Sequence, residues 1–361
     1  MSHDGSVADL AQFPRSGDFS RQPAVCSHGA VADLAQFRSV FLVKPSSLGD
    51  IVHTLPSAHF IKQAYPHLEV RWMCNPEWMP LLEGNPDLTE VTPFPRGEFR
   101  GLPALPKLCL WARKLNAAPR ALPEITLDFQ GLMRSALVAL ARGTDPVVGL
   151  SDAREGAPLF YRRTVPVDRS AHAVDRYLTL VRALGIETPQ EEITFPLPEG
   201  QAPEGFTSPT KYVLLHPSSR GKGKSLSPEA LQALCDGLAP HPVVIAGRSP
   251  EKLTVTGGHV VSLVNQTSLG ELIWLIRNAH ACISVDSGPM HIASAVQPHT
   301  LGIHTWSNPR RVGPYSPGAF VWKAGRIAHR QDFTDDEVLV RMDVDAVAAR
   351  RMADFVLKSW Y

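Results

Sequence analysis

The chain has 361 residues, of which 44% are hydrophobic, and it carries 36 Lys and Arg against 35 Asp and Glu, a formal net charge of +1. This length exceeds what one hydrophobic core normally serves and predicts two domains. The near-neutral charge argues against a protein that coats nucleic acid, and the 20% content of charged residues argues against a mainly disordered chain.

The cysteines indicate neither a disulfide framework nor a zinc site. None of the five stands in a CxxC pair, and they are far apart in the chain, at Cys26, Cys74, Cys109, Cys235 and Cys282. This spacing is typical of free thiols in a reducing compartment. No apolar stretch reaches the roughly 18–20 residues that cross a bilayer, and acidic residues stand where a signal peptide would need its apolar core. We therefore expect a cytoplasmic protein.

The N-terminal 38 residues contain a short internal repeat. The string VADLAQF occurs at Val7–Phe13 and again at Val31–Phe37. Two copies of a seven-residue string are too few for a repeat architecture. We expect residues 1–38 to form a mobile extension, and the alternative is an amphipathic segment that contacts a membrane or a partner.

From residue 39 onward, apolar runs alternate with segments of helical periodicity. Apolar residues at Ile51, Leu55, Ala58 and Ile61 define one face of a helix, and Gly131–Arg142 has similar spacing. Strands are expected at Ser39–Lys44, Glu69–Cys74, Glu90–Phe94, Ile125–Phe129 and Pro146–Leu150. Such alternation predicts a mostly parallel sheet with helices on both faces, over residues 39–186.

A proline-rich segment separates the two halves of the chain. Residues 187–209 contain five prolines, a density incompatible with a helix or a central strand, and we interpret them as a linker. A second alternating run occupies residues 210–342, and a C-terminal helix is expected at 343–361. The expected strands of this run are Tyr212–His216, Pro242–Ala246, His259–Val264, Ala281–Val285 and Thr300–His304, and its helices are Pro228–Leu238, Leu269–Ala279 and Pro289–Ala295.

The two halves together predict an α/β fold with two doubly wound, Rossmann-like domains that face each other across a cleft. In open α/β sheets, ligands bind beyond the carboxyl ends of the strands. The loops that follow the strands are therefore where we expect chemistry.

The first such loop is Lys44-Pro-Ser-Ser-Leu-Gly-Asp50, where a strand ends and Asp50 opens a helix. One interpretation is that Asp50 is an ordinary N-terminal cap. The other is that it is a carboxylate at the edge of the cleft, placed to take a proton from an incoming hydroxyl. Capping alone does not require Gly49 beside it or the hydroxyls of Ser46 and Ser47 before it.

The second loop lies in Ile283-Ser-Val-Asp-Ser-Gly-Pro-Met-His291, where a buried strand runs into Asp286 and a helix follows. The backbone N–H groups of Ser287, Gly288 and Met290 would point outward at the N-terminus of this helix, which favours an anion such as a diphosphate. The alternative is an ordinary turn between a strand and a helix.

The third loop, His216-Pro-Ser-Ser-Arg-Gly-Lys-Gly-Lys-Ser225, ends like a P-loop. A P-loop also needs Gly where Ser218 stands, so a Walker site is excluded. What remains is a basic, hydroxyl-rich loop whose Arg220, Lys222 and Lys224 either hold phosphate or form a solvated run of charge. No GxGxxG follows the first expected strand, which weighs against a dinucleotide dehydrogenase. The sequence also has no GxSxG elbow and no HExxH motif.

Taken together, the motifs resemble those of the lipopolysaccharide heptosyltransferase family, glycosyltransferase family 9, which has the GT-B fold. The resemblance covers about residues 39–315 and is closer to heptosyltransferase I than to II. It rests on Lys44-Pro-Ser-Ser-Leu-Gly-Asp-Ile-Val-His-Thr-Leu-Pro56, Leu127-Asp-Phe-Gln-Gly-Leu-Met-Arg-Ser135, Asp286-Ser-Gly-Pro-Met-His291 and Pro309-Arg-Arg-Val-Gly-Pro-Tyr315.

The resemblance implies a role for individual residues. Asp50 matches the general base, in a loop with Ser46, Ser47 and Gly49. Gln130 and Arg134 are candidates for the acceptor site. The residues that match the donor site are Ser218, Ser219, Lys224, Glu251, Asp286, Ser287, Gly288, Met290 and His291.

The implied function is an inverting transfer of heptose from ADP-heptose to the inner core of lipopolysaccharide, with an acceptor of the type 3-deoxy-manno-octulosonic acid on lipid A. No cofactor and no metal are expected, because no Asp-x-Asp pair lies beside these loops. The lipid-linked acceptor implies peripheral association with the cytoplasmic face of the inner membrane, without a transmembrane segment and without a nucleic-acid partner. The alternatives are another glycan or a protein as acceptor, and a nucleotide-sugar-binding module without catalysis.

Overall fold

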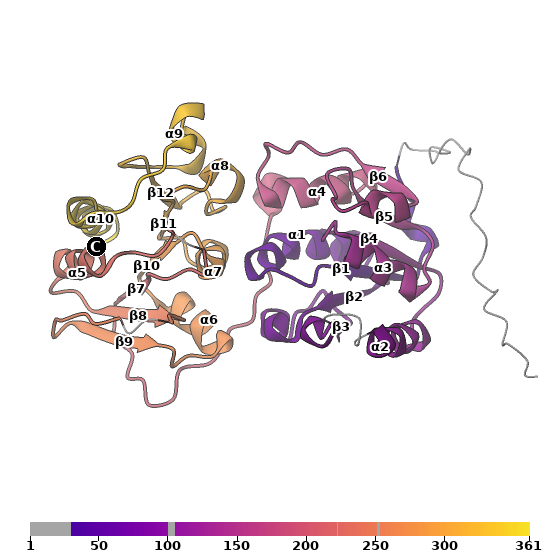
Figure 1. Ribbon diagram of the computed structural model, residues 1–361, viewed down its shortest axis with the longest axis horizontal. Helices are drawn as coiled ribbons and strands as arrows, with labels where there is room; N and C mark the ends of the chain where they lie inside the picture. Colours follow the sequence, from indigo (N-terminus) through magenta and orange to yellow (C-terminus); the bar gives the residue numbers. More distant parts are fainter. Residues whose placement is uncertain (1–29, 100–104, 222, 251–252) are drawn as a thin grey trace, which may run out of the picture.

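The computed structural model describes residues 30–99, 105–221, 223–250 and 253–361, which form two α/β domains side by side (Figure 1). The sheet of the N-terminal domain has six parallel strands in the order β3-β2-β1-β4-β5-β6. They are β1 (Ser39–Val43), β2 (Glu69–Cys74), β3 (Glu90–Pro93), β4 (Glu124–Asp128), β5 (Val147–Leu150) and β6 (Arg163–Val165).

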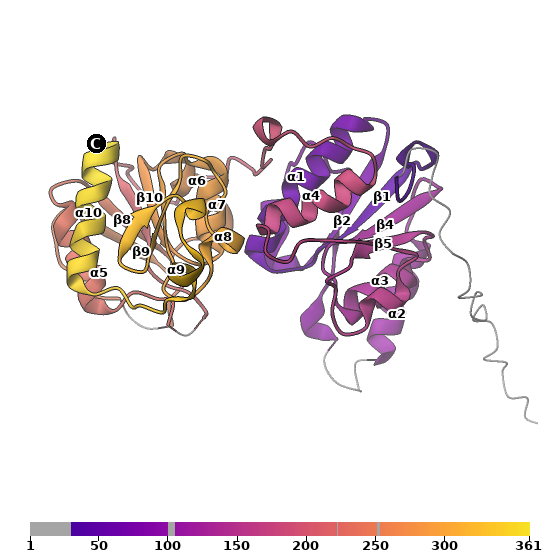
Figure 2. The same cartoon turned by 90° about the horizontal axis from the view of Figure 1, so that it is seen from above.

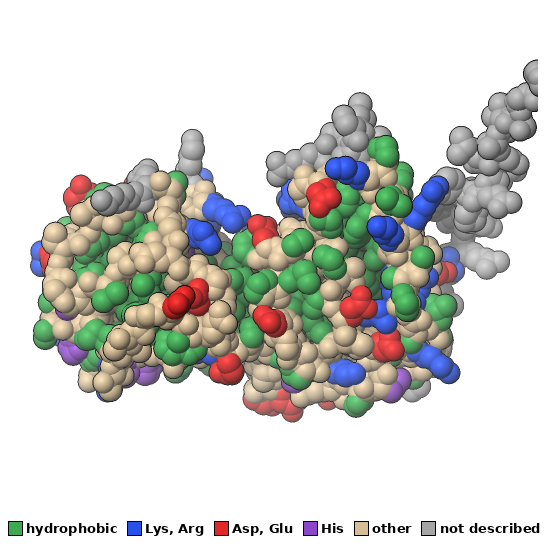
Figure 3. Space-filling view, turned by 90° about the horizontal axis from the view of Figure 1, so that it is seen from below, with side chains coloured by type: hydrophobic (Ala, Val, Ile, Leu, Met, Phe, Trp, Pro, Cys, Tyr) green, Lys and Arg blue, Asp and Glu red, His purple; other side chains and the backbone are tan. Residues whose placement is uncertain are grey.

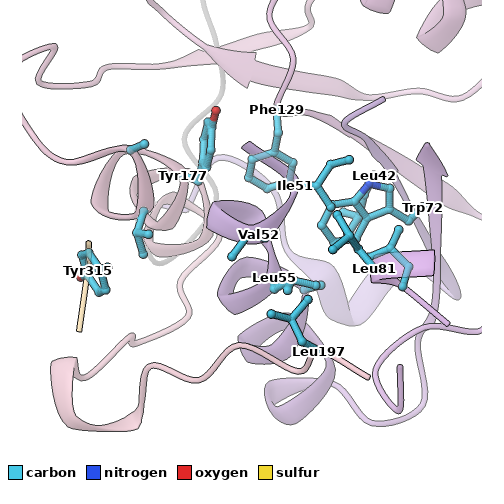
Figure 4. Packing of buried hydrophobic residues seen from close by; sticks show 14 of the residues in the cluster. Leu42, Ile51, Val52, Leu55, Trp72, Leu81, Phe129, Tyr177, Leu197 and Tyr315 are labelled. Carbon is cyan, nitrogen blue, oxygen red and sulfur yellow. The ribbon is translucent and has the colours of Figure 1, made fainter. Parts of the chain in front are cut away.

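Helices cover both faces of this sheet because the side chains of a strand alternate between the faces. Val40 and Leu42 of β1 pack in one core with α1 (Leu48–Ala64) and α4 (Ala173–Ala183). Phe41 and Val43 pack in a second core with α2 (Leu105–Ala117) and α3 (Met133–Arg142). Figure 4 shows Ile51, Val52 and Leu55 of α1 in the first core, near Leu42 and Trp72 of the sheet.

The sheet of the C-terminal domain has seven strands in the order β13-β12-β11-β10-β7-β8-β9, all parallel except β13. They are β7 (Val213–His216), β8 (Val243–Gly247), β9 (Val260–Val264), β10 (Ala281–Val285), β11 (Thr300–Ile303), β12 (Phe320–Lys323) and β13 (Arg326–Ala328). The helices are α5 (Pro228–Leu238), α6 (Leu269–Asn278), α7 (Gly288–Val296), α8 (Pro309–Val312), α9 (Asp335–Leu339) and α10 (Ala346–Trp360).

Helices cover both faces of this sheet as well. Residues of α5 and α10 share one core with the sheet, while α6 and α7 lie on the side of the N-terminal domain and share its core. Figure 2 shows α7 and α8 at the junction of the two domains. The predicted fold of two doubly wound domains is confirmed.

The strand orders explain where ligands belong. In each sheet the order reverses between two central strands, at β1 and β4 and again at β7 and β10. The crevice outside the carboxyl ends of such a pair is the usual ligand site of open α/β sheets. The loops after these four strands contain the motifs singled out in the sequence.

The expected mobile extension over residues 1–38 is wrong for its last part. The N–H of Val31 donates to the carbonyl oxygen of Ala183 (2.7 Å), and Leu34 is fully buried in the core of the N-terminal domain. The second VADLAQF string therefore packs as part of the domain, with a 3-10 turn at Leu34–Gln36 that Asp33 caps. The first string, Val7–Phe13, lies outside the described residues.

Residues 187–209 contain one short 3-10 turn, Gln190–Glu192, and otherwise no helix or strand. Hydrogen bonds hold this segment to both domains. The Asn85 side chain donates to the carbonyl oxygen of Pro196, and the Arg277 guanidinium donates to those of Leu197 and Pro198.

Smaller differences have local causes. The helix expected from Gly131 begins at Met133, because Gly131 has a φ of +66° and its N–H donates to the Asp128 carboxylate. The four described cysteines are free thiols, as predicted, and Cys26 lies outside the described residues. Within the described part of the chain, no helix combines the length and the apolar character needed to cross a membrane.

Candidate active site

Asp50 is both a helix cap and a group of the cleft. Its Oδ2 accepts hydrogen bonds from the N–H (3.0 Å) and the hydroxyl (2.7 Å) of Ser47, which makes a capping box at the start of α1. Its Oδ1 accepts a hydrogen bond from the Tyr177 hydroxyl of α4 (3.0 Å) and lies 3.9 Å from Lys44 Nζ. The side chain is 39% exposed. The two interpretations of Asp50 are thus compatible, because capping occupies one oxygen and the other faces the cleft.

The surroundings of Asp50 keep it ionised. Partial burial raises the pKa of its carboxyl, but the Lys44 ammonium and the hydrogen bonds from Ser47 and Tyr177 lower the pKa more, so it lies below the ordinary value. Lys44 is itself buried, and its Nζ donates to the Tyr177 hydroxyl (2.7 Å) and to the Phe129 carbonyl oxygen (2.9 Å). A chain of hydrogen bonds therefore runs from Lys44 through Tyr177 to Asp50.

A pocket of about 450 Å³ opens beside Asp50. Arg176 in its wall pairs with Asp152. Three further guanidinium groups line it without a hydrogen bond or ion pair to any described residue, those of Arg154, Arg169 and Arg311. The first two belong to the N-terminal domain, whereas Arg311 comes from α8 of the C-terminal domain. The pocket thus carries unpaired positive charge beside the carboxylate.

A second pocket, of about 100 Å³, adjoins the first. Gln130 lines both, and Arg134, Arg96 and Ser46 line the second. The Gln130 side-chain oxygen accepts a hydrogen bond from the Ser46 N–H (3.3 Å). The two candidates for the acceptor site, Gln130 and Arg134, therefore lie together, at the end of β4 and the start of α3.

The loops after β7 and β10 are joined to each other. Lys224 Nζ donates to Asp286 Oδ2 (2.6 Å) and lies 4.7 Å from the centre of the Trp306 ring. The Ser219 hydroxyl donates to the Asp286 carbonyl oxygen (3.4 Å). Burial raises the pKa of Asp286, but His304, Lys224 and Ser307 outweigh this effect and bring the pKa to about 2.

Three further donor-site candidates are Ser287, Ser218 and Glu251. Ser287 is the N-cap residue of α7, and its hydroxyl lies 3.2 Å from His216 Nδ1. Ser218 is buried next to Ser219. Glu251, like Lys222, lies outside the described residues.

One expectation about this region is wrong. The N–H of Met290 donates to the Ser287 carbonyl oxygen (3.1 Å), and the Met290 side chain is fully buried. Its N–H is therefore used inside the helix and does not point outward at an anion. The guanidinium of Arg220, which stays a candidate for phosphate, lies over the Trp78 ring of the N-terminal domain (5.5 Å), where it forms a contact between the domains.

The two halves of the site meet where α1 and α7 begin. A Cβ on Gly49 would lie 2.4 Å from the His291 ring, and a Cβ on Gly288 would lie 2.7 Å from Leu48. Neither glycine has a positive φ, so the close approach of the helices, and not backbone conformation, requires them. His291 Nδ1 also lies 3.0 Å from His53 Nε2. Figure 3 shows a notch between the two lobes, with Lys or Arg side chains on its C-terminal side.

Several groups of the site had no sequence signal. Tyr177, Arg169 and Arg176 reach the pocket from segments that no motif marks, whereas Arg311 lies inside the Pro309–Tyr315 motif. Among the described residues, no group of three or more His, Cys, Asp or Glu side chains could hold a metal ion.

Comparison with known proteins identifies the family of this chain. The family model described as Glycosyltransferase family 9 (heptosyltransferase) matches residues 120–341, more than half of the chain. The chain belongs to glycosyltransferase family 9. The predicted family and the predicted class of enzyme, a glycosyltransferase, are therefore confirmed.

Curated relatives of this glycosyltransferase span most of its length. Lipopolysaccharide heptosyltransferase 1 of Pseudomonas aeruginosa is 27% identical over 293 residues, 76% of this chain and 81% of the relative. The core heptosyltransferase OpsX of Haemophilus influenzae is 26% identical, over 77% and 82%. Lipopolysaccharide heptosyltransferase 1 of Escherichia coli K12 is 25% identical, over 80% and 94%.

Solved structures support the fold. One similar structure is that of E. coli heptosyltransferase WaaC in complex with ADP. The glycosyltransferase superposes on it with a TM-score of 0.70 and is 22% identical to it, over 88% of this chain and 99% of the other. It superposes on E. coli heptosyltransferase II with a TM-score of 0.66 at 20% identity, over 89% and 98%. Both neighbours confirm the GT-B architecture.

Among the described residues of the glycosyltransferase, five histidines are buried, and burial lowers the pKa of each. The pKa of His172 falls to about 3 and those of His216 and His304 to about 4, and those of His53 and His291 are also lowered. Below about pH 6.5 the unfolded chain binds protons at these positions and the native chain does not. Acid therefore favours the unfolded chain, and the free energy of unfolding falls as the pH decreases toward the folded pKa values.

We predict that His172→Gln reduces this pH dependence. Between about pH 7.5 and 5.5, one such histidine accounts for about 1.4 kcal/mol of the free energy of unfolding. In urea unfolding, the free energy of unfolding should fall between these two pH values by about this amount less in the variant than in the wild type. His67→Gln, at an exposed position, is the control and should keep the wild-type dependence. Equal losses in the wild type and His172→Gln would contradict the prediction.

Proposed function

We propose that this protein is an inverting, metal-independent heptosyltransferase of lipopolysaccharide core biosynthesis. It transfers heptose from ADP-heptose to an acceptor that carries 3-deoxy-manno-octulosonic acid. The observation that carries the proposal is the ionised carboxylate of Asp50, which faces a cationic pocket and lies at the contact between the two domains.

The relatives support the choice of reaction. The curated proteins reported above are named lipopolysaccharide heptosyltransferases, and they align along most of this chain. E. coli WaaC has been solved with ADP and with ADP-2-deoxy-2-fluoro heptose. We extend the ADP-heptose donor to this chain on that basis.

The transfer needs a base because a neutral sugar hydroxyl is a poor nucleophile. Asp50 Oδ1 takes the proton of the acceptor hydroxyl while its oxygen attacks the anomeric carbon from the face opposite the diphosphate. The bond from the anomeric carbon to the diphosphate oxygen breaks, ADP leaves with the electron pair, and the configuration inverts. Tyr177 and Ser47 hold the carboxylate in position during this step.

The leaving ADP gains negative charge, which the C-terminal domain can stabilise. In the proposal its diphosphate lies at the N-terminus of α7, near Ser287, Gly288 and the Lys224 ammonium. These groups provide positive electrostatic potential where charge develops, the role that a metal ion has in other transferases. Glu251 is proposed to bind the ribose of the donor, on the resemblance alone.

The pocket beside Asp50 suits an anionic acceptor. Arg154, Arg169 and Arg311 present guanidinium groups without partners among the described residues, and a guanidinium pairs with a carboxylate through two parallel hydrogen bonds. The carboxylate of 3-deoxy-manno-octulosonic acid is such a group. Gln130 and Arg134 extend this site toward α3.

Asp50→Asn distinguishes the proposed role of Asp50 as a base from its role in the capping box of α1. At this N3 position the amide oxygen of asparagine can still accept the hydrogen bond from the Ser47 N–H but cannot take up the proton, so we expect kcat to fall by roughly 10²–10⁴-fold with little change in donor affinity. The measurement is acceptor-dependent release of ADP from ADP-heptose in the presence of EDTA, with deacylated acceptor, and calorimetric titration of the donor. Asp50→Ala should lose the same activity and in addition some stability.

Other outcomes would reject parts of this proposal. Donor binding by the wild type without turnover on this acceptor would indicate another acceptor or a binding module. Turnover by Asp50→Asn at the wild-type rate would show that another group is the base. Loss of wild-type activity in EDTA would reject metal independence.

Arg311→Ala tests whether the C-terminal domain binds the acceptor. Loss of a charge-assisted hydrogen bond should raise the KM for the acceptor roughly tenfold or more while the KM for the donor stays unchanged. Arg310→Ala is the matched control, because the neighbouring Arg310 pairs with Asp335 outside the pocket. An acceptor with an esterified carboxylate should show no difference between the wild type and Arg311→Ala. An unchanged acceptor KM in Arg311→Ala would contradict the role.

A further inference from the structure

The outer side of α2 and α3 has an unusual composition. The two helices pack against each other on the face of the first sheet opposite α1 and α4 (Figure 2). Neither Leu105–Ala117 nor Met133–Arg142 contains an acidic residue. Basic residues are exposed on both helices. This side of the domain is therefore positively charged, although the whole chain is nearly neutral.

Leucines are exposed among these charges. Leu110 of α2 is 55% exposed, and Leu137 and Leu140 of α3 are 49% and 46% exposed. Isolated apolar residues are common on protein surfaces, but here they gather on two adjacent helices. Leu159, which is 76% exposed, follows on the 3-10 turn Ala157–Phe160 that packs against α3.

The helical spacing places charge around apolar side chains. Lys107, Arg113 and Lys114 stand three residues before, three after and four after Leu110, so all are its neighbours on the surface of α2. We call the exposed side chains of Lys107, Leu110, Arg113, Lys114, Leu137 and Leu140 the basic leucine face. Apolar side chains ringed by Lys and Arg are typical of surfaces that insert shallowly into an anionic bilayer.

We propose that the basic leucine face docks this protein on an anionic lipid surface. The occupant is argued from charge: a membrane rich in phosphatidylglycerol complements a face with several cations and no acidic residue on either helix. A second protein copy would instead place two such faces in repulsion across a two-fold interface.

The position of the face relative to the active site fits this occupant. Gln130 lines the Asp50 pocket, Arg134 and Val138 of α3 line the adjoining pocket, and the basic leucine face begins on the outer side of the same helix. Resting on the proposed function, a lipid-linked acceptor with its sugar beside Asp50 would keep its lipid end toward the membrane that this face binds.

The test compares two double variants matched in chemistry and spacing. Leu110→Ser with Lys114→Glu alters the face on α2, and Val347→Ser with Arg351→Glu alters an exposed pair of the same spacing on α10. Each protein is sedimented with vesicles of phosphatidylethanolamine and phosphatidylglycerol, and with vesicles of phosphatidylcholine alone, at low and high salt.

We expect the wild type to bind the anionic vesicles at low salt and to release them at high salt. The α2 variant should bind the anionic vesicles at least roughly tenfold more weakly than the wild type does. The α10 variant should bind them like the wild type. Failure of the wild type to bind, or an equal loss in both variants, would overturn the proposal. So would a concentration-dependent dimer that the α2 variant abolishes.

Assay of ADP release on deacylated, soluble acceptor separates this inference from the proposed function. The α2 variant should keep wild-type turnover there, which also shows that it folds. Loss of that turnover together with vesicle binding would mean that the variant disrupts the domain, and Leu137→Ser with Leu140→Ser on α3 then decides whether the face binds. Vesicle binding by a wild type that has no transferase activity would leave the face in place and reject the proposed reaction.

Discussion

The close approach of α1 and α7 holds the two halves of the site together. Each helix begins at the carboxyl edge of its own sheet, and each offers a glycine where the other presents a side chain. Gly49 makes room for His291, and Gly288 makes room for Leu48. Because protein interiors are packed as densely as organic crystals, a methyl group at either position would force the facing side chain, or the helices themselves, to shift.

The contact between α1 and α7 determines which other groups of the site lie close together. Asp50 stands one residue after Gly49, and Ser287 stands one residue before Gly288, so the Asp50 carboxylate and the N-terminus of α7 are brought to the same cleft. The charges of both Asp286 and Asp50 act on His291, which lies between the domains. The hydrogen bonds that orient Asp50 also lower its pKa, and in our proposal it gains the proton only as the glycosidic bond forms.

Much of this arrangement is readable from the sequence because it depends on local rules. The alternation of apolar runs and helical periodicity places ten of the thirteen described strands within one residue, but it misses the short strands β6, β12 and β13. Parallel sheets bring loops such as Lys44–Asp50 and Ser287–His291 to their carboxyl edges. Tyr177 and Arg311 could not be assigned in this way, because their positions depend on how α4 and α8 pack in three dimensions. The same holds for Val31–Phe37, whose burial follows from contacts with α4 rather than from its own composition.

The most direct test of the contact between α1 and α7 is the turnover of Gly49→Ala. Alanine suits a helix better than glycine, so α1 itself should be unharmed, while the methyl group would overlap the His291 ring. Gly270→Ala in α6, where nothing lies within 4 Å of the added Cβ, is the control. The account predicts that kcat/KM for acceptor-dependent ADP release falls roughly 10²-fold in Gly49→Ala and stays at the wild-type value in Gly270→Ala. Wild-type kcat/KM in Gly49→Ala would contradict it.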